Sequence, residues 1–269
     1  MATDGSEFSV GAQRVAIALA KRCGARLTAM TIILSTQDLE GVGTHGLREQ
    51  MERTAQATLD AVVAAAEAAG IDCATQLVYG DQPHQEIINT ALELEPDLIV
   101  LGRRGTRGLA RILVGHATAH VAGLAPCPVL MVPRAGEIWS RRILVAIDSS
   151  DPSAAAARMA LDLARACQLP VTLVSAITPS HGVERKAEAH AALEQFRIAL
   201  TEAWIDNEAI LAEGPPDQVV IETASSRLVD LIIVGRHERT GLGRLLLGSV
   251  SERIMGQAQC PVLIVPGSR

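Results

Sequence analysis

The sequence predicts two doubly wound α/β domains in tandem, each built on a five-stranded parallel sheet. Two observations carry this prediction: a long block occurs twice, and each half alternates short apolar runs with longer Ala-rich amphipathic stretches. Residues 96–133 match residues 229–266 without a gap, which two copies of one folding unit explain. The aligned pairs include Asp97 with Asp230, Gly102 with Gly235, Gly115 with Gly248, and Cys127 with Cys260.

The second half shows the alternation of strands and helices most clearly. Most of its expected strands are near-continuous runs of Val, Ile and Leu, a pattern typical of a parallel sheet that is covered on both faces. The alternation indicates a doubly wound sheet, for which we expect the strand order 3-2-1-4-5. The expected strands span 141–147, 171–177, 207–213, 230–234 and 261–265, and the expected helices span 152–167, 184–202, 216–228 and 248–257.

The first half follows the same order, with a helix expected at about 7–23 and a charged amphipathic helix at 46–70. Its first strand is nearly absent, because MATDGS at 1–6 stands where the second half has LVAIDSS at 144–150. A stub at the centre of a sheet leaves neighbouring backbone groups without partners. We therefore expect a truncated first strand, and we favour either a natural start upstream of the given one or a partner segment that fills the gap.

The repeat divides the 269 residues into domains at 1–136 and 137–269, joined by a short, mostly polar linker at about 134–140. With 48% apolar residues, both domains can bury full cores. The chain contains only two Trp, two Phe and one Tyr, so these cores consist of Val, Ile, Leu and Ala. Stacking of aromatic side chains on exposed bases is therefore not an expected binding mode.

Charge and cysteine content narrow the class of protein further. Each half carries a net charge of −3 within the total of −6, so neither half is a basic nucleic-acid-binding module. No apolar run approaches the roughly 18 residues of a membrane span, and the N-terminal MATDGSEFS is not typical of a secretory signal. The five cysteines are scattered without a CxxC pair, which indicates a reduced, cytoplasmic protein.

Polar and glycine-rich segments follow the first and fourth strands of each half. In a doubly wound sheet, ligands bind beyond the carboxyl ends of the strands where the strand order reverses, which here is between these two strands. Glycines let the backbone approach phosphate oxygens, a helix N-terminus attracts the anion, and a carboxylate can bind ribose hydroxyls or a metal ion. Neither GxxxxGK[ST] nor a GxGxxG after the first strand is present. The segments begin at Asp4 and Asp148 after the first strands, and at Gly102 and Gly235 after the fourth.

These segments resemble the ATP-binding pattern of the universal stress protein family, which is Gly-x-x-Gly, nine residues, and then Gly-Ser or Gly-Thr after the fourth strand. The chain also shares with that family a DGS-like turn, a CPVL ending in both halves and a proline that opens the third helix. The pattern falls on Gly102, Gly105, Gly115 and His116 in the first half and on Gly235, Glu238, Gly248 and Ser249 in the second; the turn is Asp4-Gly5-Ser6, and the prolines are Pro83 and Pro216.

The resemblance covers essentially the whole chain. It implies a Rossmann-like fold and a cytoplasmic stress-response protein that binds ATP, with or without Mg²⁺, in a regulatory role. Family members are often dimeric, so self-association is expected, as a homodimer or as an intramolecular pseudo-dimer; neither nucleic acid nor a membrane is an expected partner. The candidate nucleotide contacts are Asp4, Ile32, Gly102, Arg103, Gly105, Gly115 and His116 in the first half, and Asp148, Ala176, Gly235, Gly248, Ser249 and Val250 in the second.

Both copies depart from the family pattern. In the first, His116 replaces the Ser or Thr, although its backbone N–H remains and its imidazole can donate a hydrogen bond. The loop 102–115 holds four arginines and no acid, which suits a phosphate ligand and a solvated basic loop equally. In the second, Glu238 replaces a glycine and brings a carboxylate that repels phosphate, and Ser149 stands in place of Gly5. We therefore expect the first half to be the better ATP site, although its first strand is truncated.

Two further pairs of residues invite a functional interpretation. His116 and His120 lie one helical turn apart, but no third ligand is visible nearby, so no metal site is expected. Asp97 and Asp230 precede the fourth strands, at the end of the sheet remote from the ligand, so we expect a structural role for them.

Three functions remain open on the sequence. The one that we favour is a nucleotide-binding regulatory protein. The second is an interaction module that has lost nucleotide binding and uses the final strands PVLMV and PVLIV for dimer contacts. The third is a slow ATPase, for which Asp4 and Asp148 are the candidate general bases.

Overall fold

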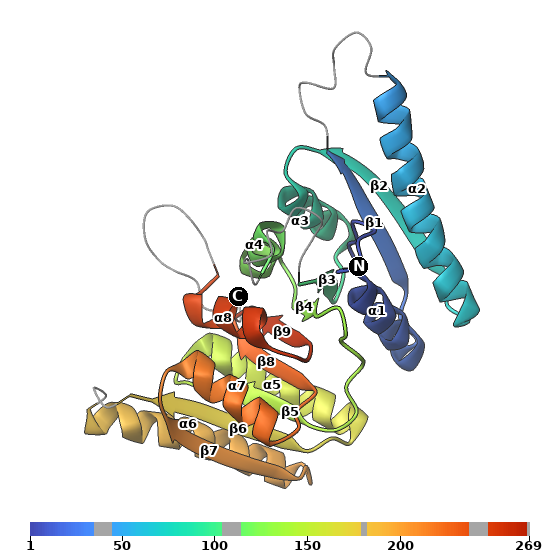
Figure 1. Ribbon diagram of the computed structural model, residues 1–269. Helices are drawn as coiled ribbons and strands as arrows, with labels where there is room; N and C mark the ends of the chain where they lie inside the picture. The colour runs from blue at the N-terminus through green and yellow to red at the C-terminus, as the bar shows by residue number, and fades with distance from the viewer. Residues whose placement is uncertain (35–44, 104–113, 179–181, 237–246, 268–269) are drawn as a thin grey trace.

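The structure, a computed structural model, describes residues 1–34, 45–103, 114–178, 182–236 and 247–267. Figure 1 shows the first half, in blue to green, above the second half, in yellow to red. In chain order the first half contains α1 (Val10–Cys23), β1 (Leu27–Leu34), α2 (His45–Ala68), β2 (Cys73–Gly80), α3 (Pro83–Leu94), β3 (Ile99–Gly102), α4 (His116–Leu124) and β4 (Val129–Val132).

The second half forms the expected five-stranded parallel sheet, in the order β7-β6-β5-β8-β9. This is the strand order 3-2-1-4-5, so the predicted topology is confirmed. Helix bounds differ from the prediction by at most two residues. The elements are β5 (Ile143–Ala146), α5 (Asp151–Cys167), β6 (Val171–Ile177), α6 (Val183–Glu202), β7 (Asn207–Glu213), α7 (Pro216–Ser226), β8 (Leu231–Gly235), α8 (Ser249–Gln257) and β9 (Val262–Val265).

The first half repeats this order with a first strand reduced to residues 1–3. Ala2 N donates to Val100 O at 3.1 Å, and Thr3 N donates to Met30 O at 2.9 Å, so the stub joins β3 on one side and β1 on the other. The expected truncation is therefore present at the centre of the sheet. Parallel β1 and β2 lie on one side of it, and parallel β3 and β4 lie on the other.

Helix α1 begins at Val10 instead of the expected residue 7. The intervening residues form a turn held by side chains: Asp4 Oδ1 accepts from Ser6 N at 3.0 Å, and Ser9 Oγ donates to Ser6 O at 2.8 Å. Ser and Asp side chains compete with the helix for backbone partners, which delays its start.

The two halves join through an antiparallel pair, β4 with β9. Leu130 lies opposite Leu263, Val129 opposite Ile264 and Met131 opposite Val262. Because Leu130 and Leu263 are equivalent in the repeat, the pairing has pseudo-two-fold symmetry about these two residues. The final apolar strands, considered above as dimer contacts, thus pair with each other within one chain and create a seven-stranded sheet.

Two equivalent arginines reinforce this junction. Arg103 Nη1 donates to the carbonyl oxygens of Gly256 at 3.2 Å and Ala258 at 2.9 Å, at the C-terminus of α8. Arg236 Nη1 donates to Ala125 O at 2.6 Å, at the C-terminus of α4. Each half therefore places a cation on the negative end of a helix dipole in the other half.

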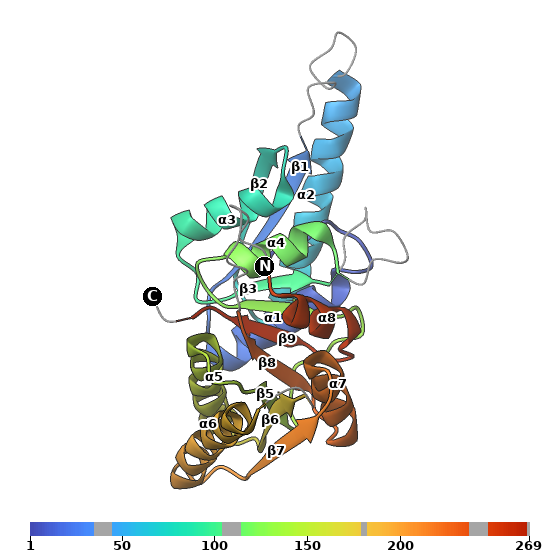
Figure 2. The ribbon, with the colours of Figure 1, turned by 90° about the vertical axis from the view of Figure 1, so that its left-hand side faces the viewer.

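A hydrophobic cluster lies on each face of the sheet and runs through both halves. Val129 and Met131 of β4 belong to one cluster, and Leu130 and Val132 belong to the other. Helices α3, α4, α7 and α8 cover the first cluster, α1, α5 and α6 cover the second, and α2 lies over a smaller third one (Figures 1 and 2). Within the described residues, no helix combines the length and apolar character that crossing a bilayer requires.

Replacing Leu130 with Ala should lower the free energy of unfolding by about 2–5 kcal/mol, because a fully buried side chain leaves a cavity at the junction. Urea unfolding measures this change. Leu92→Ala is the matched control, since Leu92 is 57% exposed on α3 and its loss should cost less than about 0.5 kcal/mol. Equal effects of the two variants would contradict the assignment of β4 to the junction.

Arg103→Ala and Arg236→Ala should each lower the free energy of unfolding by about 1–2 kcal/mol, because charge-assisted hydrogen bonds to a helix end are lost. Arg185→Ala serves as the control, since the contact that the described residues give Arg185 is an exposed ion pair with Glu188 on α6. If all three variants unfold at the same urea concentration, the two caps do not stabilise the junction.

Candidate functional site

The turn after the N-terminal stub is fixed by its own side chains. Gly5 has φ +71°, and a Cβ on it would lie 2.6 Å from Thr58 Oγ1 of α2. Gly5 N donates to Thr3 Oγ1 at 3.1 Å, next to the hydrogen bond from Ser6 N to the Asp4 carboxylate. The turn therefore requires glycine at this position, and it leaves Asp4 exposed at the carboxyl edge of the sheet.

The equivalent turn in the second half has the same outline with different residues. Asp148 Oδ1 accepts hydrogen bonds from the backbone N and the Oγ of Ser150, and Ser150 Oγ caps α5 by accepting from Ser153 N at 3.3 Å. Ser149 is not among the described non-glycine residues with positive φ. This turn therefore accommodates serine where the first half needs Gly5, and it holds Asp148 half-buried.

Gly102 and Gly235 permit close packing between the ends of the first and fourth strands. A Cβ on Gly102 would lie 2.7 Å from Phe8 O, and one on Gly235 would lie 2.4 Å from Pro152 C. The turn before α1 and the first turn of α5 occupy the space that a side chain would need. This packing sets the turn before α1 against the end of β3, and the first turn of α5 against the end of β8.

The fourth helix of each half begins with the same backbone geometry. Gly115 precedes α4 with φ −66° and ψ 142°, and Gly248 precedes α8 with φ −61° and ψ 142°. Neither residue can offer a side-chain cap, and Gly115 N donates to Arg103 O at 2.9 Å. The first N–H groups of each helix therefore have no side-chain cap and can serve as donors for an anion.

The remaining predicted contacts divide into three groups. Ile32 of β1, Ala176 of β6 and Val250 of α8 are half-buried and pack against the hydrophobic cluster on the α3–α4 side of the sheet. The Arg103 guanidinium donates to the end of α8, so its described hydrogen bonds serve the junction. Gly105, Glu238 and the other arginines of the first loop lie outside the described residues.

A cluster of three imidazoles lies beside the start of α4. The ring centroids of His116 and His120 are 4.0 Å apart, and His84 of α3 lies 4.7 Å from His120 and 6.1 Å from His116. The sequence paired His116 with His120 but gave no sign of His84, which is 32 residues away and arrives only when α3 packs on α4. Burial lowers the pKa of His84, and the charges of His120 and His116 lower it further.

The sequence offered His116 and His120 as a possible metal pair, without a third ligand. Within the described ranges, no group of three His, Cys, Asp or Glu side chains is arranged to hold a metal ion. His120 Nδ1 lies 2.8 Å from His116 O and forms a hydrogen bond with it.

The opposite edge of the sheet carries structural groups. Asp230 Oδ2 accepts from Ser140 N at 2.7 Å and from Arg141 N at 2.9 Å, and Oδ1 accepts from Arg142 N at 2.9 Å. The expected structural role of Asp230 is thereby confirmed. Burial raises the pKa of the nearby Cys260 to about 12, and the Asp230 charge contributes, so this thiol stays protonated.

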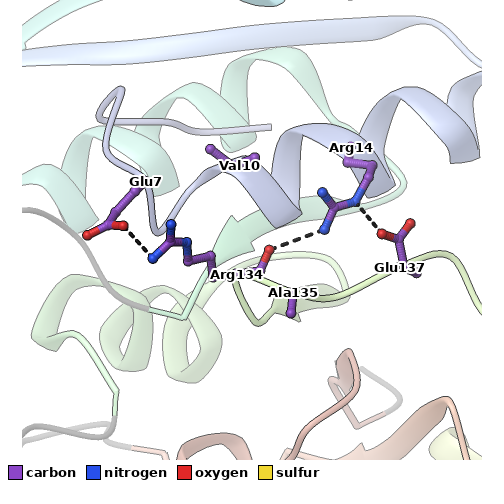
Figure 3. A pocket seen from close by; sticks show the side chains of 6 residues that line it. All are labelled: Glu7, Val10, Arg14, Arg134, Ala135 and Glu137. Carbon is purple, nitrogen blue, oxygen red and sulfur yellow. Dashed lines mark hydrogen bonds and ion pairs between the residues drawn. The ribbon is translucent and has the colours of Figure 1, made fainter.

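A hollow beside α1 holds the linker between the halves (Figure 3). Arg14 Nε lies 2.9 Å from Glu137 Oε1, Arg14 Nη2 donates to Arg134 O at 3.2 Å, and Arg134 forms an ion pair with Glu7. These contacts attach the linker to α1 and to the turn before it. We therefore assign this hollow to the connection between the two halves and not to a ligand. A second, larger hollow of about 740 Å³ lies between the start of α1 and α2 and includes the turn at Gly5 and Ser6.

Comparison with known proteins identifies relatives of both halves. A model of the universal stress protein family matches residues 1–133 and 140–266. Universal stress protein Rv2005c of Mycobacterium tuberculosis is 28% identical over 236 residues, which cover 80% of this chain and 77% of that protein. Universal stress protein MJ0531 of Methanocaldococcus jannaschii is 32% identical over 145 residues, which cover 49% of this chain and 85% of that protein.

A solved structure shares the overall fold. The crystal structure of a universal stress protein from Archaeoglobus fulgidus matches with a TM-score of 0.79 at 21% identity, and the match covers 98% of this chain and 96% of that one. The repeat, the strand order 3-2-1-4-5 of the second half and the two matches to the family model agree. The chain belongs to the universal stress protein family and contains two such domains in tandem.

Proposed function

We propose that this protein is a cytoplasmic regulatory protein that binds ATP beyond the carboxyl ends of the N-terminal stub and β3. The packing of Gly102 under the turn before α1 carries this proposal, because it sets the turn that follows Asp4 against the end of β3, the strand that precedes α4 in the chain. A carboxylate suits the ribose hydroxyls, and the free N–H groups at the start of α4 suit a phosphate group. Ile32 lies on the same side of the sheet as α4 and offers an apolar surface to the adenine.

The first half is proposed as the stronger site. Asp4 is exposed, whereas Asp148 is half-buried and held by Ser150. The first half also supplies imidazoles where the second half has Ser249 and Arg253. The second half keeps the helix geometry at Gly248 but combines it with Glu238, whose charge opposes phosphate.

A regulatory role is favoured over hydrolysis by the position of the two candidate bases. Asp4 Oδ1 and Asp148 Oδ1 each accept a backbone hydrogen bond from their own turn. A carboxylate that holds a turn is placed for binding more than for activating water. The interaction-module alternative loses its main surface, because β4 and β9 pair with each other.

Addition of Mg–ATP should raise the melting temperature of the protein, because a ligand that binds only the folded state stabilises it. At a ligand concentration of 100 times the Kd, the gain is about 2.7 kcal/mol. Thermal unfolding with ATP, and with GTP as the control nucleotide, measures this effect. An unchanged melting temperature at millimolar ATP would contradict the proposed function and favour the interaction module.

Asp4→Asn should weaken ATP binding about tenfold in isothermal titration, because a hydrogen bond to a charged group contributes about 1.5–3 kcal/mol. Asparagine keeps the oxygen that accepts from Ser6 N, so the turn remains. Asp148→Asn is the matched control in the second half and should change the affinity less than about twofold. The reverse pattern would show that the second half holds the nucleotide.

A further inference from the structure

Two helices begin at the imidazole cluster of the first half. Helix α3 starts at Pro83, so His84 is its second residue, and α4 starts at His116. Figures 1 and 2 both show α3 and α4 side by side. The positive ends of two helix dipoles therefore converge on the three rings, which suits an anionic ligand.

The charges around the cluster do not neutralise it. Strands β1, β2 and β4, which pack against these helices, carry no Asp, Glu, Lys or Arg, and their titratable side chains are Cys73 and Tyr79. On α3 the acids are Glu86 and Glu93, and Glu86 lies over Gly80, where a Cβ would be 2.4 Å from Glu86 Cγ. Among the described residues, the other charged neighbours along the chain are Asp81 before α3 and Arg103, whose guanidinium reaches α8; Arg104, Arg107 and Arg111 lie outside the described residues.

The two other imidazoles are the charges that act on His84. Burial is the main cause that lowers the pKa of His84, and the charges of His120 and His116 add to it. The cluster thus favours the neutral form of His84 in the free protein. An anion beside an imidazole reverses this preference, because it stabilises the protonated ring.

In the second half, the equivalent positions carry side chains whose charges cancel. The repeat aligns His84 with Asp217 and His120 with Arg253, and these two form an ion pair with Arg253 Nε 2.9 Å from Asp217 Oδ2. That pair joins α7 to α8 as the rings join α3 to α4. One half therefore carries a neutral ion pair, and the other carries three groups that can all become cations.

We propose that His84, His116 and His120 form the polyphosphate end of the nucleotide site, and that nucleotide binding there takes up protons, so affinity rises as the pH falls. This inference rests on the proposed function. His116 stands where the resemblance places a hydroxyl against phosphate, and a protonated ring donates charge-assisted hydrogen bonds to phosphate oxygens.

The direction of the pH dependence follows from a comparison of the free protein with the nucleotide-bound protein. In the free protein the pKa of His84 is lowered, and a bound phosphate raises it. At a pH well above both pKa values, the ring is neutral in the free and in the bound protein. At a pH well below both pKa values, it is protonated in the free and in the bound protein. Proton uptake, and the gain in affinity, therefore accumulate as the pH falls through the interval between the two pKa values.

Isothermal titration of the full chain with Mg–ATP at pH 6 and pH 8, in two buffers of different ionisation enthalpy, measures the affinity and the number of protons taken up. If binding raises the pKa of one imidazole by about one unit, ATP binds about fivefold more tightly at pH 6. The double variant His84→Asp with His120→Arg copies the ion pair of the second half, so it keeps the contact between α3 and α4. It should bind ATP with a smaller pH dependence and take up fewer protons.

Free ATP itself takes up a proton near pH 6, and the protonation of the free nucleotide is the same in every titration, so the difference between proteins reports on the site. His190→Asn, on the exposed face of α6, should behave as the unmodified protein. Equal proton uptake by the double variant and the unmodified protein would overturn the inference and leave the proposed function intact. Absence of ATP binding at both pH values would overturn the proposed function and the inference together.

Discussion

The antiparallel pairing of β4 with β9 is the constraint on which the rest of this molecule depends. It unites the sheets of two repeats, extends both hydrophobic clusters across the junction and sets the pseudo-two-fold relation between the halves. That relation brings the first residue after each fourth strand to the fourth helix of the opposite half. Arg103 and Arg236 can act as helix caps only because the strands meet in this register.

The sequence predicted most of the second half, because its strands are long apolar runs and its helices have clear periodicity. The repeat then supplied the topology of the first half, including the stub at its centre. The start of α1 was predicted too early, because apolar spacing continues into a turn that Asp4 and Ser9 hold through their side chains. Local hydrogen bonds of this kind leave little trace in hydrophobic periodicity.

The candidate nucleotide site stays a prediction, and the contacts that surround it depend on tertiary packing. The strand order alone predicts that the turns at Asp4 and Gly102 lie at the same edge of the sheet. Phe8 approaches Gly102 so closely that a side chain would not fit there, and a sequence motif does not reveal this packing role of the glycine. The position of His84 and the reach of Arg103 join residues that are distant in the chain, so no local pattern could have shown them.

The covalent link between the repeats, fastened by Arg14 and Arg134, has a consequence for how such a molecule can evolve. In a dimer of identical subunits, every substitution appears on both sides of the symmetry axis. Here each copy can change alone while β4 and β9 preserve the shared framework. One repeat can therefore keep Asp217 with Arg253, while its neighbour carries histidines in those places and becomes chemically specialised.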